Sequence, residues 1–334
     1  MATIPSRPFS TVLIVTLALA AAAAAAPARG EEDVQHWLDR MSRAVEALDY
    51  RGTLVHVRNG QVDTLRVIHR SDENGVRERI VSIDGAPREV IRNGDKVRCV
   101  LPGDNPVTLE SRLTGRLLPS LPVNRLLGPE SAYLMSLGER ERVAGMMARI
   151  IHIQPRDAYR YGSRLWLEEQ TGMLLRYALI DHDGRQLQQV SFTSLELGAN
   201  IADSEFEPEF IGREASGTWV EQALRPSGTS LQRASYAPRV PRGFRLVNAG
   251  QGSGKAGESF EYLLYSDGLS SFSIYVEPAD SGNVASRVDA MGPVHVYTTQ
   301  SGGRLFTVVG EVPSATVEFV GRQLRHAGRR TPQG

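Results

Sequence analysis

The sequence contains a single cysteine, Cys99, among its 334 residues. A lone cysteine cannot form an internal disulfide, so a disulfide framework does not hold this fold together. Cys99 alternates with Val97 and Leu101 in a segment that reads as a strand. We expect a buried free thiol that packs as a small hydrophobic side chain, with an intermolecular bridge as the alternative.

Net charge is also absent. The 38 basic and 38 acidic residues cancel, and only two of the basic residues are lysines, Lys96 and Lys255. A chain without net charge has no long-range field that attracts nucleic acid or an anionic membrane surface. We therefore expect no nucleic-acid partner.

Motifs for metal binding and phosphate binding are missing as well. The seven histidines are scattered, without paired spacing and without a cysteine partner, so we expect no zinc or other metal site. The segment Gly250–Lys255 resembles a phosphate-binding loop. However, Ala249 stands where the first glycine belongs, and Ala256 stands where a serine or threonine would bind magnesium. We expect a mobile hairpin loop there.

Pairs of residues that suggest catalysis also have simpler interpretations. His56 and Asp63 could form part of a triad, but no serine lies in a nucleophile elbow, so we expect a cross-strand hydrogen bond. Glu168 and Glu169 are neighbours that point to opposite faces of a strand, and we expect a solvated strand end. The sequence thus predicts no catalytic residue and no cofactor, and a hydrolase is the least favoured function.

The N-terminus has the pattern of a secretory signal peptide, residues 1–28. Arg7 precedes an uncharged run from Pro8 to Ala28, and small residues at Ala26 and Ala28 form an A-x-A cleavage site. We expect cleavage after Ala28 and export. An uncleaved membrane anchor is the alternative, although the Ala-rich second half of the run is weakly apolar for a membrane span.

Turn dipeptides punctuate the segment from Tyr50 to Pro102, at Asn59-Gly60, Asn74-Gly75, Asp84-Gly85 and Asn93-Gly94. Each supplies the positive backbone angles of a two-residue hairpin turn, and the residues between alternate between apolar and charged. The turn at Asn59-Gly60 predicts that His56 faces Asp63. The turn at Asn93-Gly94 predicts that Val90 faces Val97. The segment is predicted to be an antiparallel meander with one covered face.

The rest of the pattern predicts a large first domain, residues 29–211. Apolar residues from Val34 to Leu48 recur at helical spacing, which indicates a helix across one face of the sheet. Further strands up to residue 200 bring the total to roughly eight to ten, and a sheet of this size tends to curl.

A segment rich in Gly, Ser, Pro and Arg, residues 212–241, is predicted to be a linker and hinge, with Trp219 docked on the first domain. A small α+β domain is predicted over residues 242–334. It should end in a helix entered at Pro313.

Two apolar surfaces are candidate binding sites. The inside of the curled sheet is predicted to bind lipid, with a filled core as the alternative. Its predicted lining is Leu54, Leu65, Val67, Trp166, Leu174 and Tyr177. Aromatic residues on two adjacent strands of the second domain either pack on the terminal helix or face a protein partner. The predicted partner-binding residues are Phe260, Tyr262, Phe272 and Tyr275.

A series of motifs, in this order and spacing, resembles the MucB/RseB family of periplasmic regulators of envelope-stress sigma factors. The motifs span the chain beyond the signal peptide. They include Asp84-Gly-x-Pro-Arg-Glu-Val, Tyr159-Arg-Tyr-Gly-Ser-Arg-Leu-Trp-Leu-Glu, Tyr265-Ser-Asp-Gly-Leu-Ser-Ser-Phe-Ser and Val308-Val-Gly-Glu-Val-Pro313.

The resemblance implies an α+β fold: a large unclosed antiparallel β-barrel covered by helices, similar to the lipoprotein carriers of the Lol pathway, and a smaller C-terminal α+β domain. It implies a periplasmic negative regulator of an alginate-type sigma factor. Such a regulator binds the periplasmic part of a transmembrane anti-sigma factor of the RseA/MucA kind and protects it from regulated proteolysis. Lipid or lipopolysaccharide relieves the protection. A homodimer is a further expected assembly, and a periplasmic lipid or lipoprotein carrier is the alternative function.

Overall fold

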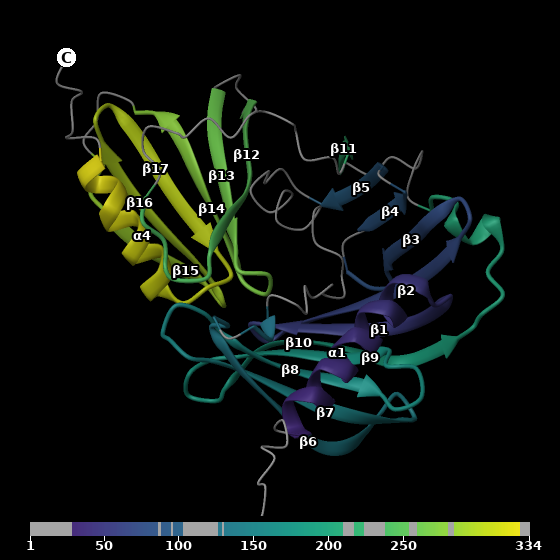
Figure 1. The fold of residues 1–334 in the computed structure, drawn as a ribbon. Coiled ribbons are helices and arrows are strands. Elements are labelled where there is room, and N and C mark those ends of the chain that lie inside the picture. Colours follow the sequence, from purple (N-terminus) through teal and green to yellow (C-terminus); the bar gives the residue numbers. More distant parts are fainter. Residues whose placement is uncertain are drawn as a thin grey trace, which may run out of the picture.

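The computed structural model describes residues 29–85, 88–94, 96–102, 126–128, 130–209, 217–223, 238–253, 259–279 and 284–327. The predicted signal peptide lies outside the described residues, so its cleavage stays a prediction. Within the described ranges, no helix is long and apolar enough to span a membrane. The strands form two separate sheets, which lie in two domains (Figure 1).

The large domain consists of one antiparallel sheet of eleven strands and the helix α1 (Arg29–Ala47). The strand order is β11-β5-β4-β3-β2-β1-β10-β9-β8-β7-β6. The strands are β1 (Tyr50–Arg58), β2 (Gln61–Asp72), β3 (Gly75–Ser82), β4 (Glu89–Asn93), β5 (Lys96–Pro102), β6 (Tyr133–Val143), β7 (Met146–Pro155), β8 (Gly162–Glu168), β9 (Leu174–Ile180), β10 (Gln186–Leu197) and β11 (Gly217–Ala223). Two meanders therefore join through β1 and β10. The edge strands β11 and β6 do not pair in the described structure, which confirms the unclosed sheet.

The first hairpin forms as predicted. Asn59 and Gly60 both have positive φ, 51° and 74°. His56 faces Asp63 across the two strands. A local turn rule therefore sets the register of this hairpin, because two residues with positive φ match the twist of the flanking strands.

The register predicted at the fourth turn is wrong. Val90 pairs with Cys99 and not with Val97, because Asn93 still pairs with Lys96 and the turn begins one residue later. The pairing of the two strands thus shifts by two residues, and because this number is even the same side chains stay on each face of the sheet. Cys99 lies in β5 between β4 and β11. The burial of its thiol stays a prediction.

Helix α1 crosses one face of the large sheet and closes its core (Figure 1). The stripe predicted from apolar spacing is buried, and Val34, Leu38 and Met41 are 0% exposed. Burying such side chains contributes about 1.5–3 kcal/mol each relative to exposure. The helix is therefore held mainly by its apolar face.

The prediction of a solvated strand end is wrong for Glu168. Glu168 is only 6% exposed. It accepts hydrogen bonds from the backbone N–H of Gln170 at 2.9 Å and from the N–H and hydroxyl of Thr171, each at 2.6 Å. Arg40 of α1 donates to the carbonyl oxygen of Glu169 at 2.9 Å. The turn after β8 is therefore a docking point for α1.

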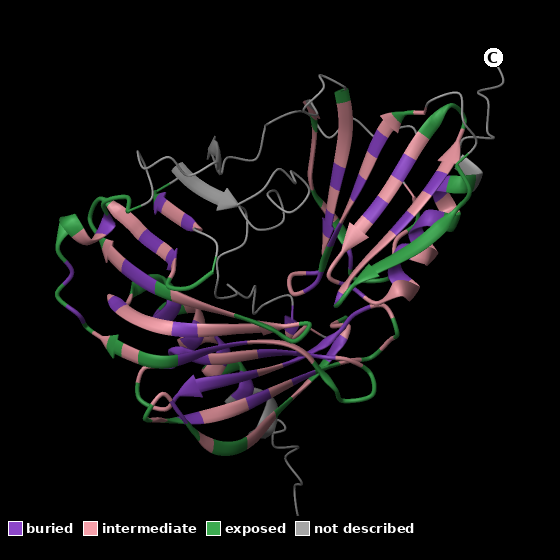
Figure 2. Cartoon of the chain, turned by 180° about the vertical axis from the view of Figure 1, so that it is seen from behind, coloured by how far each residue is buried: buried purple, intermediate pink, exposed green. Residues whose placement is uncertain are grey.

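The small domain consists of a six-stranded antiparallel sheet and the helix α4 (Ser314–Ala327). The strand order is β12-β13-β14-β17-β16-β15. The strands are β12 (Arg245–Ser253), β13 (Ser259–Ser266), β14 (Ser271–Pro278), β15 (Arg287–Met291), β16 (Val294–Ser301) and β17 (Arg304–Gly310). Helix α4 packs on β15, β16 and β17. It begins directly after Pro313, as predicted. Figure 2 shows buried and half-buried residues alternating along β13 and β14.

The loop predicted at Gly250–Lys255 begins as a strand. β12 continues through Gly250 and Gly252. The rings of Tyr262 and Phe260 on β13 cover these two glycines, and a Cβ at Gly250 would lie 2.8 Å from the Tyr262 ring. The aromatic rings supply the packing that glycine lacks, so the strand persists. Residues 254–258 lie outside the described residues.

The segment predicted as a linker also contains a strand. β11 pairs with β5 at the edge of the large sheet, and Trp219 is opposite Val100. β11 belongs to the first sheet and β12 to the second. The change of domain therefore falls between these strands, while the boundaries at 211 and 242 stay predictions. Strand β15 was not predicted, because it is short and polar.

Candidate ligand and partner surfaces

The six residues predicted to line a lipid cavity lie in or against the packed core of the large domain. Leu54 and Leu174 are 0% exposed, Val67 is 1% and Trp166 is 6%. Leu65 and Tyr177 pack against the same core. Burial raises the pKa of the Tyr177 hydroxyl. In the described structure these six side chains therefore pack in or against the hydrophobic core, and their role in lipid binding stays a prediction.

Trp166 points away from the other predicted lipid residues. It pairs with Arg176 across β8 and β9, while its neighbour Leu165 pairs with Tyr177. Successive side chains point to opposite faces, so Trp166 and Tyr177 lie on different sides of the sheet. The indole donates to Oε2 of Glu141 at 2.7 Å, and the Arg176 guanidinium lies 5.0 Å from the indole centre.

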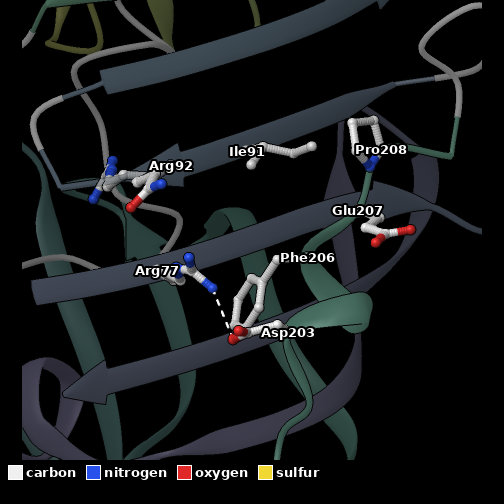
Figure 3. A pocket seen from close by; sticks show the side chains of 8 residues that line it. Arg77, Ile91, Arg92, Asp203, Phe206, Glu207 and Pro208 are labelled. Atoms are coloured by element: carbon white, nitrogen blue, oxygen red, sulfur yellow. Dashed lines mark hydrogen bonds and ion pairs between the residues drawn. The ribbon is translucent and has the colours of Figure 1, made fainter. Parts of the chain in front are cut away.

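The structure contains a pocket that the sequence did not predict (Figure 3). It lies between β3, β4 and the segment of residues 198–209 that follows β10, which we call the strap. The strap includes a short 3-10 helix, η1 (Asp203–Phe206). The pocket has a volume of about 410 Å³ and is lined by Arg77, Ile91, Arg92, Asn93, Asp203, Phe206, Glu207 and Pro208.

Arginines of β2 and β3 hold the strap against the sheet. Arg70 and Arg77 donate to Oδ1 of Asp203 at 2.6 and 2.9 Å. Hydrogen bonding and charge from Arg70, aided by Arg77, lower the pKa of Asp203. The same two guanidinium groups lie 5.5 and 5.8 Å from the ring centre of Phe206. The strap therefore has both ionic and cation–π contacts to the sheet.

A second anchor lies further along the strap. Arg79 donates from Nε to Oε1 of Glu89 at 2.7 Å and from Nη2 to Oε2 of Glu209 at 3.1 Å. The side chains of Arg79 and Glu89 are 8% and 1% exposed. The alternation of Arg77 and Arg79 places both on one face of β3, which was visible in the sequence. Their partners on the strap, Asp203 and Glu209, lie more than a hundred residues away in the chain and were not visible there.

The four predicted partner-binding aromatics lie on two faces of the small sheet. Tyr262 pairs with Tyr275, and Phe260 makes an edge contact with Tyr275 at 5.7 Å between ring centres. These three are half-buried and point away from α4. Phe272 points the other way, is 1% exposed and stacks on Tyr265 at 5.3 Å. Phe272 is therefore a core residue and not part of that surface, because alternate residues of a strand face opposite sides.

The surface formed by Phe260, Tyr262 and Tyr275 is the aromatic face of the small domain. Helix α4 covers the opposite face of the sheet and leaves these rings partly accessible. A pocket of about 270 Å³ opens beside Phe260 and has both acidic and basic residues at its rim, including Glu261, Glu277 and Arg304. Partly exposed aromatic rings with a polar rim are typical of protein interfaces.

The pairs considered for catalysis have structural partners. Asp63 faces His56 and forms an ion pair with Nη2 of Arg88 at 3.1 Å. Across the residues that the structure describes, no group of three or more His, Cys, Asp or Glu side chains is arranged to hold a metal ion.

Both domains match one family. The model of the MucB/RseB N-terminal domain matches residues 33–210, and the model of the MucB/RseB C-terminal domain matches residues 232–325. The large unclosed sheet and the small α+β domain thus correspond to the two domains of this class of regulatory protein. The chain belongs to the MucB/RseB family.

Relatives share the full two-domain arrangement. The sigma factor AlgU regulatory protein MucB of Pseudomonas aeruginosa is 32% identical over 315 residues, 90% of this chain and 93% of that protein. The sigma-E factor regulatory protein RseB of Escherichia coli is 26% identical over 292 residues, 86% and 89% of the two chains.

Solved structures show the same fold. The structure of the Pseudomonas aeruginosa MucA/MucB complex superposes with a TM-score of 0.69 at 28% identity, over 86% of this chain and 96% of that chain. A crystal structure of MucB in complex with MucA(peri) gives 0.67 at 29% identity, over 85% and 96%.

Proposed function

We propose that this protein is a periplasmic, non-enzymatic negative regulator of an envelope-stress sigma factor of the alginate type. It binds the periplasmic part of a transmembrane anti-sigma factor and protects it from regulated proteolysis. The observation that carries this proposal is similarity over both domains to regulatory proteins, including one solved in complex with MucA. The superposition with the MucA/MucB complex covers 96% of that chain, so both of its domains have a counterpart in this protein.

The aromatic face of the small domain supports partner binding. Aromatic side chains dominate interface energetics when a partner excludes water from them. Phe260, Tyr262 and Tyr275 lie together on adjacent strands and are already fixed by cross-strand packing. Little side-chain entropy would therefore be lost on binding a peptide segment of the anti-sigma factor.

We propose that the strap pocket takes a lipid or lipopolysaccharide that relieves the protection. Ile91, Phe206 and Pro208 offer an apolar wall, and Arg77 offers a cation. Each acyl methylene buried there would contribute about 0.8 kcal/mol. An anionic head group would compete with Asp203 for Arg77 and would so weaken the attachment of the strap.

A periplasmic lipid or lipoprotein carrier is the second candidate, and the strap pocket is the observation in its favour. The filled core beneath α1 speaks against it, because a carrier needs an interior that opens for its cargo. The aromatic face of the small domain also has no evident role in a carrier.

Titration of the mature chain, residues 29–334, with the periplasmic segment of the anti-sigma factor tests the proposal. We expect saturable binding, slower cleavage of the segment by its site-specific protease, and weaker binding in the presence of lipopolysaccharide. Lipopolysaccharide binding without any binding or protection of the segment would favour the carrier. Sedimentation of the mature chain at several concentrations tests the expected homodimer.

A further inference from the structure

Three consecutive residues of the large domain contact three different parts of the small domain. We call residues 159–161, in the loop between β7 and β8, the interdomain segment. The carbonyl oxygen of Tyr159 accepts a hydrogen bond from the hydroxyl of Thr316 in α4. The ring of Tyr159 packs edge-on against Phe319 of the same helix, with 5.4 Å between the ring centres.

The third residue of the segment, Tyr161, reaches the small-domain sheet. Its hydroxyl lies 3.3 Å from Nδ1 of His295 in β16. Burial raises the pKa of Tyr161 to about 12. Tyr161 therefore stays protonated and neutral at physiological pH.

Arg160, at the centre of the segment, is completely buried and all three of its guanidinium nitrogens are engaged. Nη1 donates to Oδ2 of Asp267 at 2.7 Å, and Nη2 donates to the carbonyl oxygen of Arg242 at 2.6 Å. Nε donates to Oδ1 of Asp157 at 3.1 Å. Two of these acceptors belong to the small domain and one to the large domain, so one side chain bridges both.

Aromatic rings from the two domains flank the guanidinium group. Its carbon lies 5.6 Å from the ring centre of Tyr133 in the large domain and 4.7 Å from that of Phe244 in the small domain. The Tyr133 hydroxyl also donates to Oδ2 of Asp267 at 2.8 Å. Asp267 thus accepts from two large-domain side chains at the same oxygen.

The small domain holds its half of this contact in advance. The other oxygen of Asp267 accepts from the backbone N–H groups of Leu269 and Ser270, at 2.9 and 2.8 Å. Gly243 has a φ of +90°, and a Cβ there would lie only 3.2 Å from Nη1 of Arg160. The carboxylate and the approach path for the guanidinium are therefore preorganised.

The position of Asp267 connects this contact to the aromatic face. Asp267 lies in the turn between β13 and β14, the two strands that carry Phe260, Tyr262 and Tyr275. On the other side, β8 begins at Gly162, directly after the interdomain segment, and runs through the core of the large sheet. A movement of that sheet would therefore displace Arg160 and pull on the turn at Asp267.

We propose that Arg160 is a positioning residue that holds the small domain in one orientation and transmits ligand occupancy of the large domain to the aromatic face. A buried, fully hydrogen-bonded ion pair suits this task because any other orientation leaves a charge buried without a partner. The transmission, but not the orientation, rests on the proposed function. The coupling between the large domain and the aromatic face then runs through the interdomain segment and not through a hinge in residues 212–241.

The test of orientation is an interdomain distance. Glu73 and Arg322, both exposed, are replaced by p-acetylphenylalanine and labelled with nitroxides. Double electron–electron resonance then reports the distance between the two labels, and Cys99 stays unlabelled. The variants are Arg160→Gln and Asp267→Asn, with Tyr133→Phe as a milder change that keeps the ion pair. Arg242→Gln is the matched control, because it removes an exposed ion pair to Glu130, with side chains 78% and 77% exposed, and leaves the Arg242 carbonyl in place.

We expect one narrow distance distribution in the natural protein and in Arg242→Gln. Arg160→Gln and Asp267→Asn should give a broad or multiple distribution while circular dichroism shows both domains folded, and Tyr133→Phe should give an intermediate width. An unchanged narrow distribution in a folded Arg160→Gln would overturn the proposal. If Arg160→Gln does not fold, Tyr133→Phe decides: an unchanged width would then count against it.

The test of transmission measures the affinity for the anti-sigma segment with and without lipid A. In the natural protein and in Arg242→Gln, lipid A should weaken binding by about fivefold or more, the usual scale of such coupling. In Arg160→Gln the factor should fall to near one. A retained factor would contradict transmission through Arg160. Absence of segment binding in the natural protein would instead refute the proposed function, and the distance measurement would still decide the orientation.

Discussion

Nη1 of Arg160 lies 2.7 Å from Oδ2 of Asp267, and the two side chains are 0% and 3% exposed. The residues stand 107 positions apart in the chain and belong to different domains. The pair is therefore a tertiary contact that brings the sheet of the large domain and the aromatic strands of the small domain into one arrangement.

This pair should matter for stability as well as for orientation. Removing one partner of a buried, hydrogen-bonded ion pair costs roughly 3–5 kcal/mol, because the remaining charge has no compensation. We expect Asp267→Asn to lower the free energy of unfolding by an amount near the bottom of this range, since asparagine still accepts a hydrogen bond. Urea unfolding measures it. Glu130→Gln, which breaks only the exposed pair with Arg242, should cost less than about 1 kcal/mol. Equal losses for both variants would contradict the assignment.

Glu168 should make stability depend on pH. Burial by itself raises the pKa of this carboxyl, but hydrogen bonds from the Thr171 hydroxyl and from the N–H groups of Gln170 and Thr171 outweigh it, so the folded-state pKa is lowered. A lowered pKa stabilises the fold above the unfolded pKa of about 4.3, and this contribution is lost as the pH falls through the folded value.

Glu168→Gln should therefore reduce the free energy of unfolding by about 1–3 kcal/mol at pH 7, and the difference from the natural protein should shrink below about pH 4. Urea titrations at pH 7, 5 and 3 measure it. Glu169→Gln is the control, because its side chain pairs with Arg140, which is 61% exposed. A difference that grows on acidification would contradict the sign.

The filled core of the large domain leads to a third prediction. Leu54→Ala and Leu174→Ala, at positions 0% exposed, should each lower the free energy of unfolding by about 2–5 kcal/mol through lost burial and the cavity left behind. Thermal and urea unfolding measure this loss. Val62, which is 59% exposed, provides a control through Val62→Ala with a change of less than about 0.5 kcal/mol. A small loss at Leu54 together with lost lipid binding would show that these residues line a ligand cavity after all.

The two faces of β14 lead to a fourth prediction. Phe272→Ala should cost about 3–5 kcal/mol of stability, because Phe272 is 1% exposed in the small-domain core. Tyr275→Ala, on the opposite face, should cost much less stability but weaken binding of the anti-sigma segment about tenfold or more, as interface aromatics commonly do. Calorimetric titration and unfolding of both variants separate the effects. Unchanged affinity in Tyr275→Ala would place the partner elsewhere.

Much of the fold was predictable because its determinants are local. The hairpin at Asn59-Gly60 follows from two residues that accept positive φ. Helix α1 follows from apolar spacing that buries Val34 and Leu38, and α4 begins after Pro313 because proline suits the start of a helix. The two-domain division and the family motifs also lie in the sequence itself.

Where local signals allowed two outcomes, tertiary packing decided. Period-two alternation put Phe272 and Tyr275 on different faces, but only the position of α4 determined which face is buried. The turn near Asn93 begins one residue later than the dipeptide rule predicts, which shifts the strand pairing by two residues. β11 formed inside a Gly- and Ser-rich segment because the free edge of β5 supplied its hydrogen bonds.

The sequence by itself determined the local elements, the two domains and the membership of a regulatory family, since each rests on neighbouring residues or on motifs in order. Only the tertiary structure decided the sites. The strap pocket needs Asp203 to meet Arg77, and the interdomain contact needs Arg160 to meet Asp267. Such pairs join residues more than a hundred positions apart, and no periodicity or turn signal records them, because the chain brings them together only when the sheets have formed.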